Sequence, residues 1–217
     1  LVHISAIGAD PEGASLYAAS KGEGEKAVLA AFPNAVILRP SVIFGPEDGF
    51  FNRFAGMARL GPVLPLVGGN TRFQPVYVDD VAQAAVKGLT GAAAPGIYEL
   101  GGPDVDTLKG HVAKMLAVIR RRRLVLNLPF FVGSIIGGLA DAGSALTLGL
   151  VTNRILTRDQ VTSLRKDSVV SEGAKTLADL EITATDMDAL LPEYLWRYRP
   201  SGQYAAIKES AKNLRKA

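Results

Sequence analysis

Short apolar runs alternate with helix-like stretches through the first half of the chain. Leu1–Ile7 and Ala35–Leu38 are rich in Val, Ile and Leu, a pattern typical of strands that are buried on both faces of a parallel sheet. The segment Ser15–Phe32 between them predicts a helix. This β-α-β order predicts an α/β fold built on a parallel sheet.

Further elements follow at similar spacing. Helix Val81–Thr90 is predicted to begin at Asp79 or Asp80, because a carboxylate there can accept hydrogen bonds from the free N–H groups of the first turn. The Gly- and Pro-rich segment 61–69 predicts a connection. A short helix, an extended stretch and a strand are expected at Phe50–Arg59, Arg72–Tyr77 and Gly96–Leu100.

The pattern changes at Thr107, so we divide the chain into residues 1–106, which contain the sheet, and residues 107–217, a small mixed C-terminal subdomain and tail. The second part combines helical stretches, a basic run and a long apolar segment. These are a helix from Thr107 to about Arg120, the arginines 120–123, the apolar stretch Leu128–Val151, and helices near Thr157–Lys166 and Ala184–Tyr198.

The chain opens directly on an apolar strand. No start methionine and no turn precede Leu1. We therefore expect a fragment whose sheet lacks its first strands.

Tyr17 and Lys21 form the first candidate for chemistry. Residues at i and i+4 share one face of a helix, so the phenol and the ammonium would point into the same space. A free phenol has a pKa of about 10, and a cation one turn away is expected to lower it. Spacing alone also permits a surface tyrosine beside a solvated lysine.

The surrounding sequence gives this pair a context. Ser5 ends the strand before the helix, Arg39-Pro-Ser-Val-Ile-Phe-Gly-Pro46 follows the next strand, and Gln74-Pro-Val-Tyr-Val-Asp-Asp-Val81 comes later. From Leu1 to about Gly102 this order resembles the extended and atypical short-chain dehydrogenases/reductases, which include NAD-dependent sugar-nucleotide epimerases and dehydratases.

Within that superfamily, the chain is similar to the nucleotide-binding accessory subunits of respiratory complex I and their bacterial relatives. The residues that carry this similarity extend over nearly the whole chain: Glu25–Pro33, Phe44–Phe54, Thr157–Val161 and Tyr194–Arg199. The resemblance implies a Rossmann-type doubly wound parallel sheet that binds NADP or NAD. It also implies a partner, complex I or another membrane-associated assembly. The expected location is then the bacterial cytoplasm at the inner membrane or the mitochondrial matrix face of the inner membrane.

The resemblance also implies roles for single residues. Tyr17 would be the general acid/base, Lys21 would hold the nicotinamide ribose and tune Tyr17, and Ser5 would polarise a substrate oxygen. The backbone near four residues would line the nicotinamide: Pro40, Ser41, Val42 and Ile43.

Three departures from the family pattern leave the activity open. Ser5 is followed by Ala6 where the family usually has further hydroxyl residues, the loop Ala6–Leu16 is short, and no Gly-x-Gly-x-x-Gly turn is present. One hypothesis is an accessory subunit whose nucleotide is structural or regulatory. The second is an active oxidoreductase or epimerase that uses Tyr17 and Lys21, and the third is a scaffold without nucleotide.

Composition and charge exclude several other classes. The net charge is only +3, which does not indicate nucleic-acid binding. The chain has no cysteine, and its two histidines, His3 and His111, lie far apart, so we expect no metal site. The segment Leu128–Val151 is long enough to cross a bilayer, but Pro129 and Asp141 favour a subdomain helix. Contact with a membrane surface is the intermediate hypothesis, through four basic residues: Arg120, Arg121, Arg122 and Arg123.

Several side chains have two interpretations. Arg39 is expected to form an ion pair at the strand end, with a cofactor phosphate as the alternative. Asn52 and Arg53 would either contact a ligand at the mouth of the cleft or only pack. The run Tyr194–Arg199 holds the residue types that dominate interface energies, and would either bind the partner or close the subdomain core.

Overall fold

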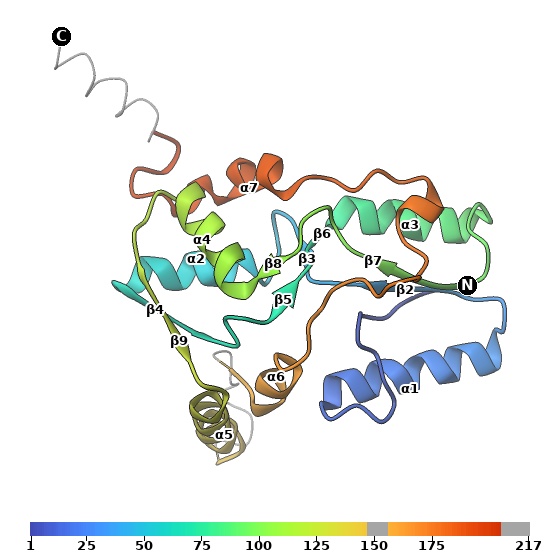
Figure 1. Cartoon of the computed structure of the whole chain (residues 1–217), viewed down its shortest axis with the longest axis horizontal. Coiled ribbons are helices and arrows are strands. Elements are labelled where there is room, and N and C mark those ends of the chain that lie inside the picture. The colour runs from blue at the N-terminus through green and yellow to red at the C-terminus, as the bar shows by residue number, and fades with distance from the viewer. Residues whose placement is uncertain (147–155, 205–217) are drawn as a thin grey trace, which may run out of the picture.

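A parallel sheet with a helix on each face forms one end of the molecule. The computed structural model describes residues 1–146 and 156–204 (Figure 1). The strands β1 (Val2–Ile4), β2 (Val36–Pro40) and β7 (Gly96–Leu100) lie in the order β1-β2-β7 and are all parallel. The helices α1 (Leu16–Ala31) and α3 (Val78–Thr90) cover opposite faces of this sheet (Figure 1). The predicted α/β fold with parallel strands is confirmed.

Alternation along β2 decides which helix each residue meets, because successive side chains of a strand point to opposite faces. Val36 and Leu38 pack in one buried cluster with Val81 and Ala84 of α3. Arg39 points to the other face, where it meets α1 through the carboxylate of Glu25. The predicted ion pair of Arg39 is therefore confirmed.

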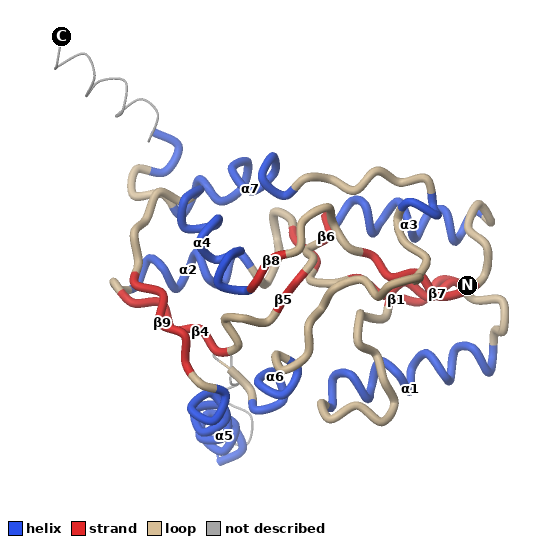
Figure 2. The backbone as a smooth tube through the Cα atoms, viewed as in Figure 1, coloured by secondary structure: helices blue, strands red, loops and turns tan. Residues whose placement is uncertain are grey.

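A second core occupies the other end of the molecule. It is formed by buried side chains of α2 (Phe51–Leu60), α4 (Leu108–Val118) and α7 (Met187–Leu195). Short two-stranded ladders accompany this core (Figure 2). They pair β3 (Ile43–Phe44) with β6 (Val76–Tyr77) and β4 (Val63–Val67) with β9 (Leu124–Leu128) in parallel, and β5 (Arg72–Phe73) with β8 (Asp106–Thr107) antiparallel.

Two further helices complete the C-terminal part. They are α5 (Phe130–Leu146) and α6 (Arg158–Ser163), and they lie together below the second core (Figure 1). Within the described residues, no helix combines the length and apolar character needed to cross a membrane. The end of the predicted apolar stretch, residues 147–151, and the tail from residue 205 lie outside the described residues.

Two local expectations are wrong. Segment 61–69 contains β4, a strand that tolerates Pro65 because the ladder to β9 uses only one side of it. Helix α3 begins earlier than predicted, with Tyr77 at its N-cap and no side-chain cap. Asp80 lies inside the first turn and instead accepts hydrogen bonds from the N–H (2.8 Å) and hydroxyl (2.7 Å) of Thr185.

Candidate functional site

Tyr17 and Lys21 lie on α1 as their spacing predicts. The Lys21 Nζ is 5.9 Å from the centre of the Tyr17 ring, and it donates a hydrogen bond to the Ile4 carbonyl at 3.3 Å. Tyr17 is 52% exposed. The ammonium therefore contacts the face of the phenol and ties α1 to the end of β1.

The expected lowering of the Tyr17 pKa is wrong for this structure. Partial burial raises the pKa of the Tyr17 phenol, because the protein surroundings solvate a phenolate less well than water does. The Lys21 ammonium contacts the ring and donates to the Ile4 carbonyl. It therefore does not donate to the phenolate oxygen and does not offset the effect of burial on the pKa.

The first turn of α1 is held by a residue far away in the sequence. Ser15 accepts from the N–H of Ala18 at 3.1 Å, as an N-cap does. Asp159 of α6 accepts from the N–H of Leu16 at 2.6 Å and of Tyr17 at 3.1 Å. A carboxylate is favoured there by the positive end of the helix dipole. Asp159 thus fixes the backbone that carries Tyr17.

Ser5 lies under α1 in a buried polar cluster. Its Oγ is buried without a hydrogen-bond partner, yet it lies close enough to help lower the pKa of Glu25. Burial alone would raise the pKa of Glu25, but the hydrogen bonds and charge of Arg39 outweigh it and lower the pKa. Glu99 lies 3.7 Å from the same guanidinium. The Ser5 hydroxyl is therefore turned toward this cluster.

The segment Pro40–Ile43 runs from the last residue of β2, at its carboxyl end, to the first residue of β3. Its anchor is Ser41, whose hydroxyl donates to the Ser168 carbonyl at 2.6 Å and whose N–H donates to the Leu100 carbonyl at 2.9 Å. These bonds fix the segment between the sheet and the chain that follows α6.

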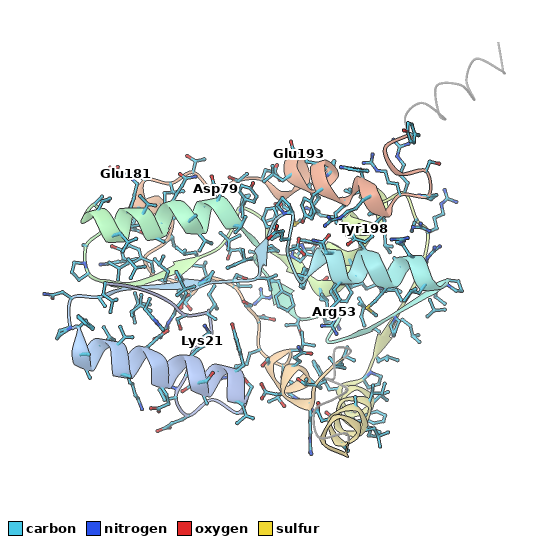
Figure 3. All side chains as sticks on the ribbon, turned by 180° about the vertical axis from the view of Figure 1, so that it is seen from behind. Lys21, Arg53, Asp79, Glu181, Glu193 and Tyr198 are labelled. Carbon is cyan, nitrogen blue, oxygen red and sulfur yellow. The ribbon has the colours of Figure 1, made fainter. Side chains whose placement is uncertain are left out.

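One cavity of about 970 Å³ brings the predicted residues together. It lies at the carboxyl ends of β1 and β2, where open α/β sheets bind ligands. Figure 3 labels two of its wall residues, Lys21 on α1 and Arg53 on α2. All seven predicted site residues line it: Ser5, Tyr17, Lys21, Pro40, Ser41, Val42 and Ile43.

Sequence reasoning missed much of the wall. Arg53 lines the cavity, where a contact with a ligand was one of its two interpretations. The Asn52 amide instead donates to the carbonyls of Pro46 and Asp48 at 3.1 Å. Helix α6 and the residues around it form a further side of the cavity, including Thr157, Asp159, Gln160 and Leu164. The Thr157–Val161 motif had drawn attention to this segment through the family resemblance. In the structure, its Asp159 forms a hydrogen bond with the start of α1.

The run Tyr194–Arg199 is largely used inside the chain. Leu195 is fully buried, and the Tyr194 hydroxyl donates to Asp48 at 2.6 Å. Arg197 donates to the Pro46 carbonyl at 2.8 Å. Only Trp196, at 39% exposed, leaves a large apolar surface to solvent among these six residues. The core interpretation therefore describes Tyr194 and Leu195.

The basic run divides between internal and outward-facing side chains. Arg121 donates to the Tyr198 carbonyl at 2.8 Å and Arg123 to the Ala58 carbonyl at 2.7 Å. Arg120 and Arg122 are exposed. Contact of this run with a membrane surface stays a prediction.

The chain is similar to known proteins both in sequence and in structure. Residues 8–120 match the family described as RmlD substrate binding domain. The chain is 34% identical, over 93% of its length and 51% of the relative's, to NADH dehydrogenase (ubiquinone) 1 alpha subcomplex subunit 9, mitochondrial, of Arabidopsis thaliana. It therefore spans about half the length of the curated relatives it matches.

Solved structures with the same fold carry dinucleotides. A dTDP-glucose 4,6-dehydratase of Bacillus anthracis in complex with NAD has a TM-score of 0.60 and 15% identity, covering 94% of this chain and 63% of that one. A dTDP-4-dehydrorhamnose reductase of the same organism in complex with NADP has a TM-score of 0.53 and 16% identity, covering 89% and 64%. These matches show the fold.

Proposed function

Because the chain belongs to the RmlD family of NAD-dependent epimerase/dehydratase-like short-chain dehydrogenases/reductases, we propose that it is part of an NAD(P)(H)-binding accessory subunit of respiratory complex I. Its nucleotide is structural or regulatory and is not turned over rapidly. The single observation that carries this proposal is the 34% identity over 93% of the chain to a subunit of NADH dehydrogenase (ubiquinone).

The site supports a role in binding. Lys21 donates to the Ile4 carbonyl and lines the same cavity as Pro40–Ile43, which supports a ribose held between them. Ser5, the expected partner of a reacting oxygen, has its hydroxyl buried beside Glu25. Raising the pKa of Tyr17 also makes it a poorer base at neutral pH.

Calorimetry on the intact protein with NADPH and with NADH tests the binding. We expect saturable binding of at least one of them, and Lys21→Ala should weaken it about tenfold, as expected for one lost hydrogen bond from a charged group. Lys26→Ala is the matched control, because Lys26 is exposed on the same helix and pairs only with Glu23. Absence of binding of both dinucleotides at millimolar concentration would overturn the proposal.

The partner is tested separately by co-purification. We expect the intact protein to remain with solubilised complex I, or another membrane-associated assembly, at physiological salt. Purification only as a free species under the same conditions would contradict the assembly part of the proposal and leave dinucleotide binding untouched.

The second candidate function is an active oxidoreductase or epimerase, favoured by the accessibility of Tyr17 to the cavity. In it, Tyr17 would transfer the proton at its hydroxyl and Lys21 would hold the ribose. Tyr17→Phe should then abolish turnover with little change in dinucleotide affinity, because only the proton-transfer group is lost. Equal turnover of the wild type and Tyr17→Phe would remove Tyr17 from the mechanism.

A further inference from the structure

The cavity has two chemically different halves. Around Tyr17 and Lys21 its wall carries hydroxyl groups, charges and the backbone of Pro40–Ile43. Beyond Phe50 the wall is mainly apolar and comes from α2, β4, β9, α5 and the end of α6. Its members include Phe54, Met57, Val67, Leu128, Ile136 and Leu164.

The charges of the wall favour an anion at the boundary of the two halves. Both carboxylates of the wall are already engaged, Asp159 with the N-terminus of α1 and Asp167 with Arg72. Arg53 has no carboxylate partner among the described residues. It is exposed on α2 and lines the cavity, and it precedes Phe54 of the apolar half in the chain.

We propose that the apolar half binds an amphipathic molecule with one long apolar chain and an anionic head group, the head held by Arg53. This inference rests on the proposed function, because the dinucleotide occupies the polar half and brings its nicotinamide next to the second ligand. A sugar nucleotide is disfavoured, since its hydroxyl groups would lose water against side chains that offer no hydrogen bonds.

The size of the cavity supports a ligand of this kind. Pockets of about 300–1,000 Å³ hold drug-sized molecules, and this cavity of about 970 Å³ is at the upper end of that range. Burial of each further methylene group should raise the affinity up to about fourfold. The affinity of a series of chains should therefore rise steeply until the apolar half is filled.

Titration of the intact, NADPH-loaded protein with octanoate, decanoate and dodecanoate, each below its micellar concentration, tests the proposal. Helix α5 offers a matched pair of variants: Ile136 lines the cavity, whereas Ile135 is 59% exposed and does not line it. Ile136→Asp should weaken dodecanoate binding at least tenfold, and Ile135→Asp should leave it within twofold of the wild type.

The head group is tested with a second pair on α2. Arg53→Gln should weaken dodecanoate binding about tenfold while leaving binding of neutral dodecanol unchanged, and Arg59→Gln, which does not line the cavity, is its control. Equal affinities along the chain series, or equal losses from Ile135→Asp and Ile136→Asp, would overturn the proposal. Saturable binding of UDP-glucose to the NADPH-loaded protein, together with no binding of dodecanoate, would assign the cavity to a sugar nucleotide. That result would also overturn the proposal.

The two proposals fail in distinguishable ways. Binding of NADPH without binding of octanoate, decanoate or dodecanoate leaves the proposed function standing and refutes the proposed amphipathic ligand. Binding of dodecanoate to the unloaded protein, weakened by Arg53→Gln and Ile136→Asp as expected, together with no binding of either dinucleotide, refutes the proposed function alone.

Discussion

Replacement of Asp159 by alanine removes the acceptor of two backbone hydrogen bonds at the start of α1. The Leu16 and Tyr17 amides, at 2.6 and 3.1 Å from its carboxylate oxygens, then lose their protein partner. Hydrogen bonds to a charged group contribute about 1.5–3 kcal/mol when buried, and loss of a helix cap costs about 0.5–2 kcal/mol. Because Asp159 is half-buried and water can replace it, we expect a loss of about 1–2 kcal/mol.

Hydrogen exchange resolved at single amides measures this loss where it occurs. A loss of about 1–2 kcal/mol corresponds to roughly 5- to 30-fold faster exchange, which we expect at Leu16 and Tyr17. The global melting temperature should fall by about 2–8 °C. Asp159→Asn keeps one oxygen acceptor and should recover part of the effect. Asp179→Ala, a remote acceptor of the Thr176 N–H, should leave both amides unchanged.

Wild-type exchange of both amides in Asp159→Ala would refute this role of Asp159. The first turn would then be stabilised by Ser15 alone. A lower melting temperature without faster exchange at Leu16 and Tyr17 would also refute a local role, because the lost stability would then lie elsewhere in the fold.

Three further variants test other parts of the structure. Burial lowers the pKa of His111, so this imidazole is protonated in the unfolded chain at a higher pH than in the folded chain. Stability is therefore lost as pH falls through about 6.5. His111→Gln should lose less stability between pH 7 and pH 5 in urea unfolding, and an identical pH slope for the two proteins would contradict this. Tyr194→Phe loses its hydrogen bond to Asp48 and about 1–2 kcal/mol of the free energy of unfolding with no change in NADPH affinity, and an unchanged urea midpoint would count against it. A Cβ on Gly22 would collide with the backbone of Asp10 and Pro11, so Gly22→Ala should cost about 1–3 kcal/mol in thermal unfolding, against no cost if the loop moves freely.

Local patterns in the sequence predicted the parts of the site that depend on local geometry. The spacing of Tyr17 and Lys21 placed both on one helical face, and the strand just before Ser5 placed that face beside the sheet. The segment Pro40–Ile43 follows a strand whose buried run was also clear. Such features need only the periodicity of the elements that contain them.

Features that depend on distant contacts were not predictable in this way. Nothing near Asp159 indicates that its carboxylate accepts from Tyr17, because the partners are 142 positions apart. Asp80 is a normal cap by sequence, but the Thr185 segment offers it better donors. Strand β4 contains Pro65, and only the ladder to β9 makes that segment a strand.

The position of α6 makes the cavity wall and the start of α1 thermodynamically linked. One short helix supplies Gln160 to the wall and Asp159 to the amide of Tyr17. A ligand that binds more tightly when α6 is docked against α1 must shift the equilibrium toward the docked state. Docking must in turn raise the affinity for the ligand by the same factor. A ligand in the apolar half would therefore stabilise the backbone at Tyr17 without any contact between the ligand and the phenol. A partner that binds the outer face of α6 would change the affinity of the cavity for its ligand.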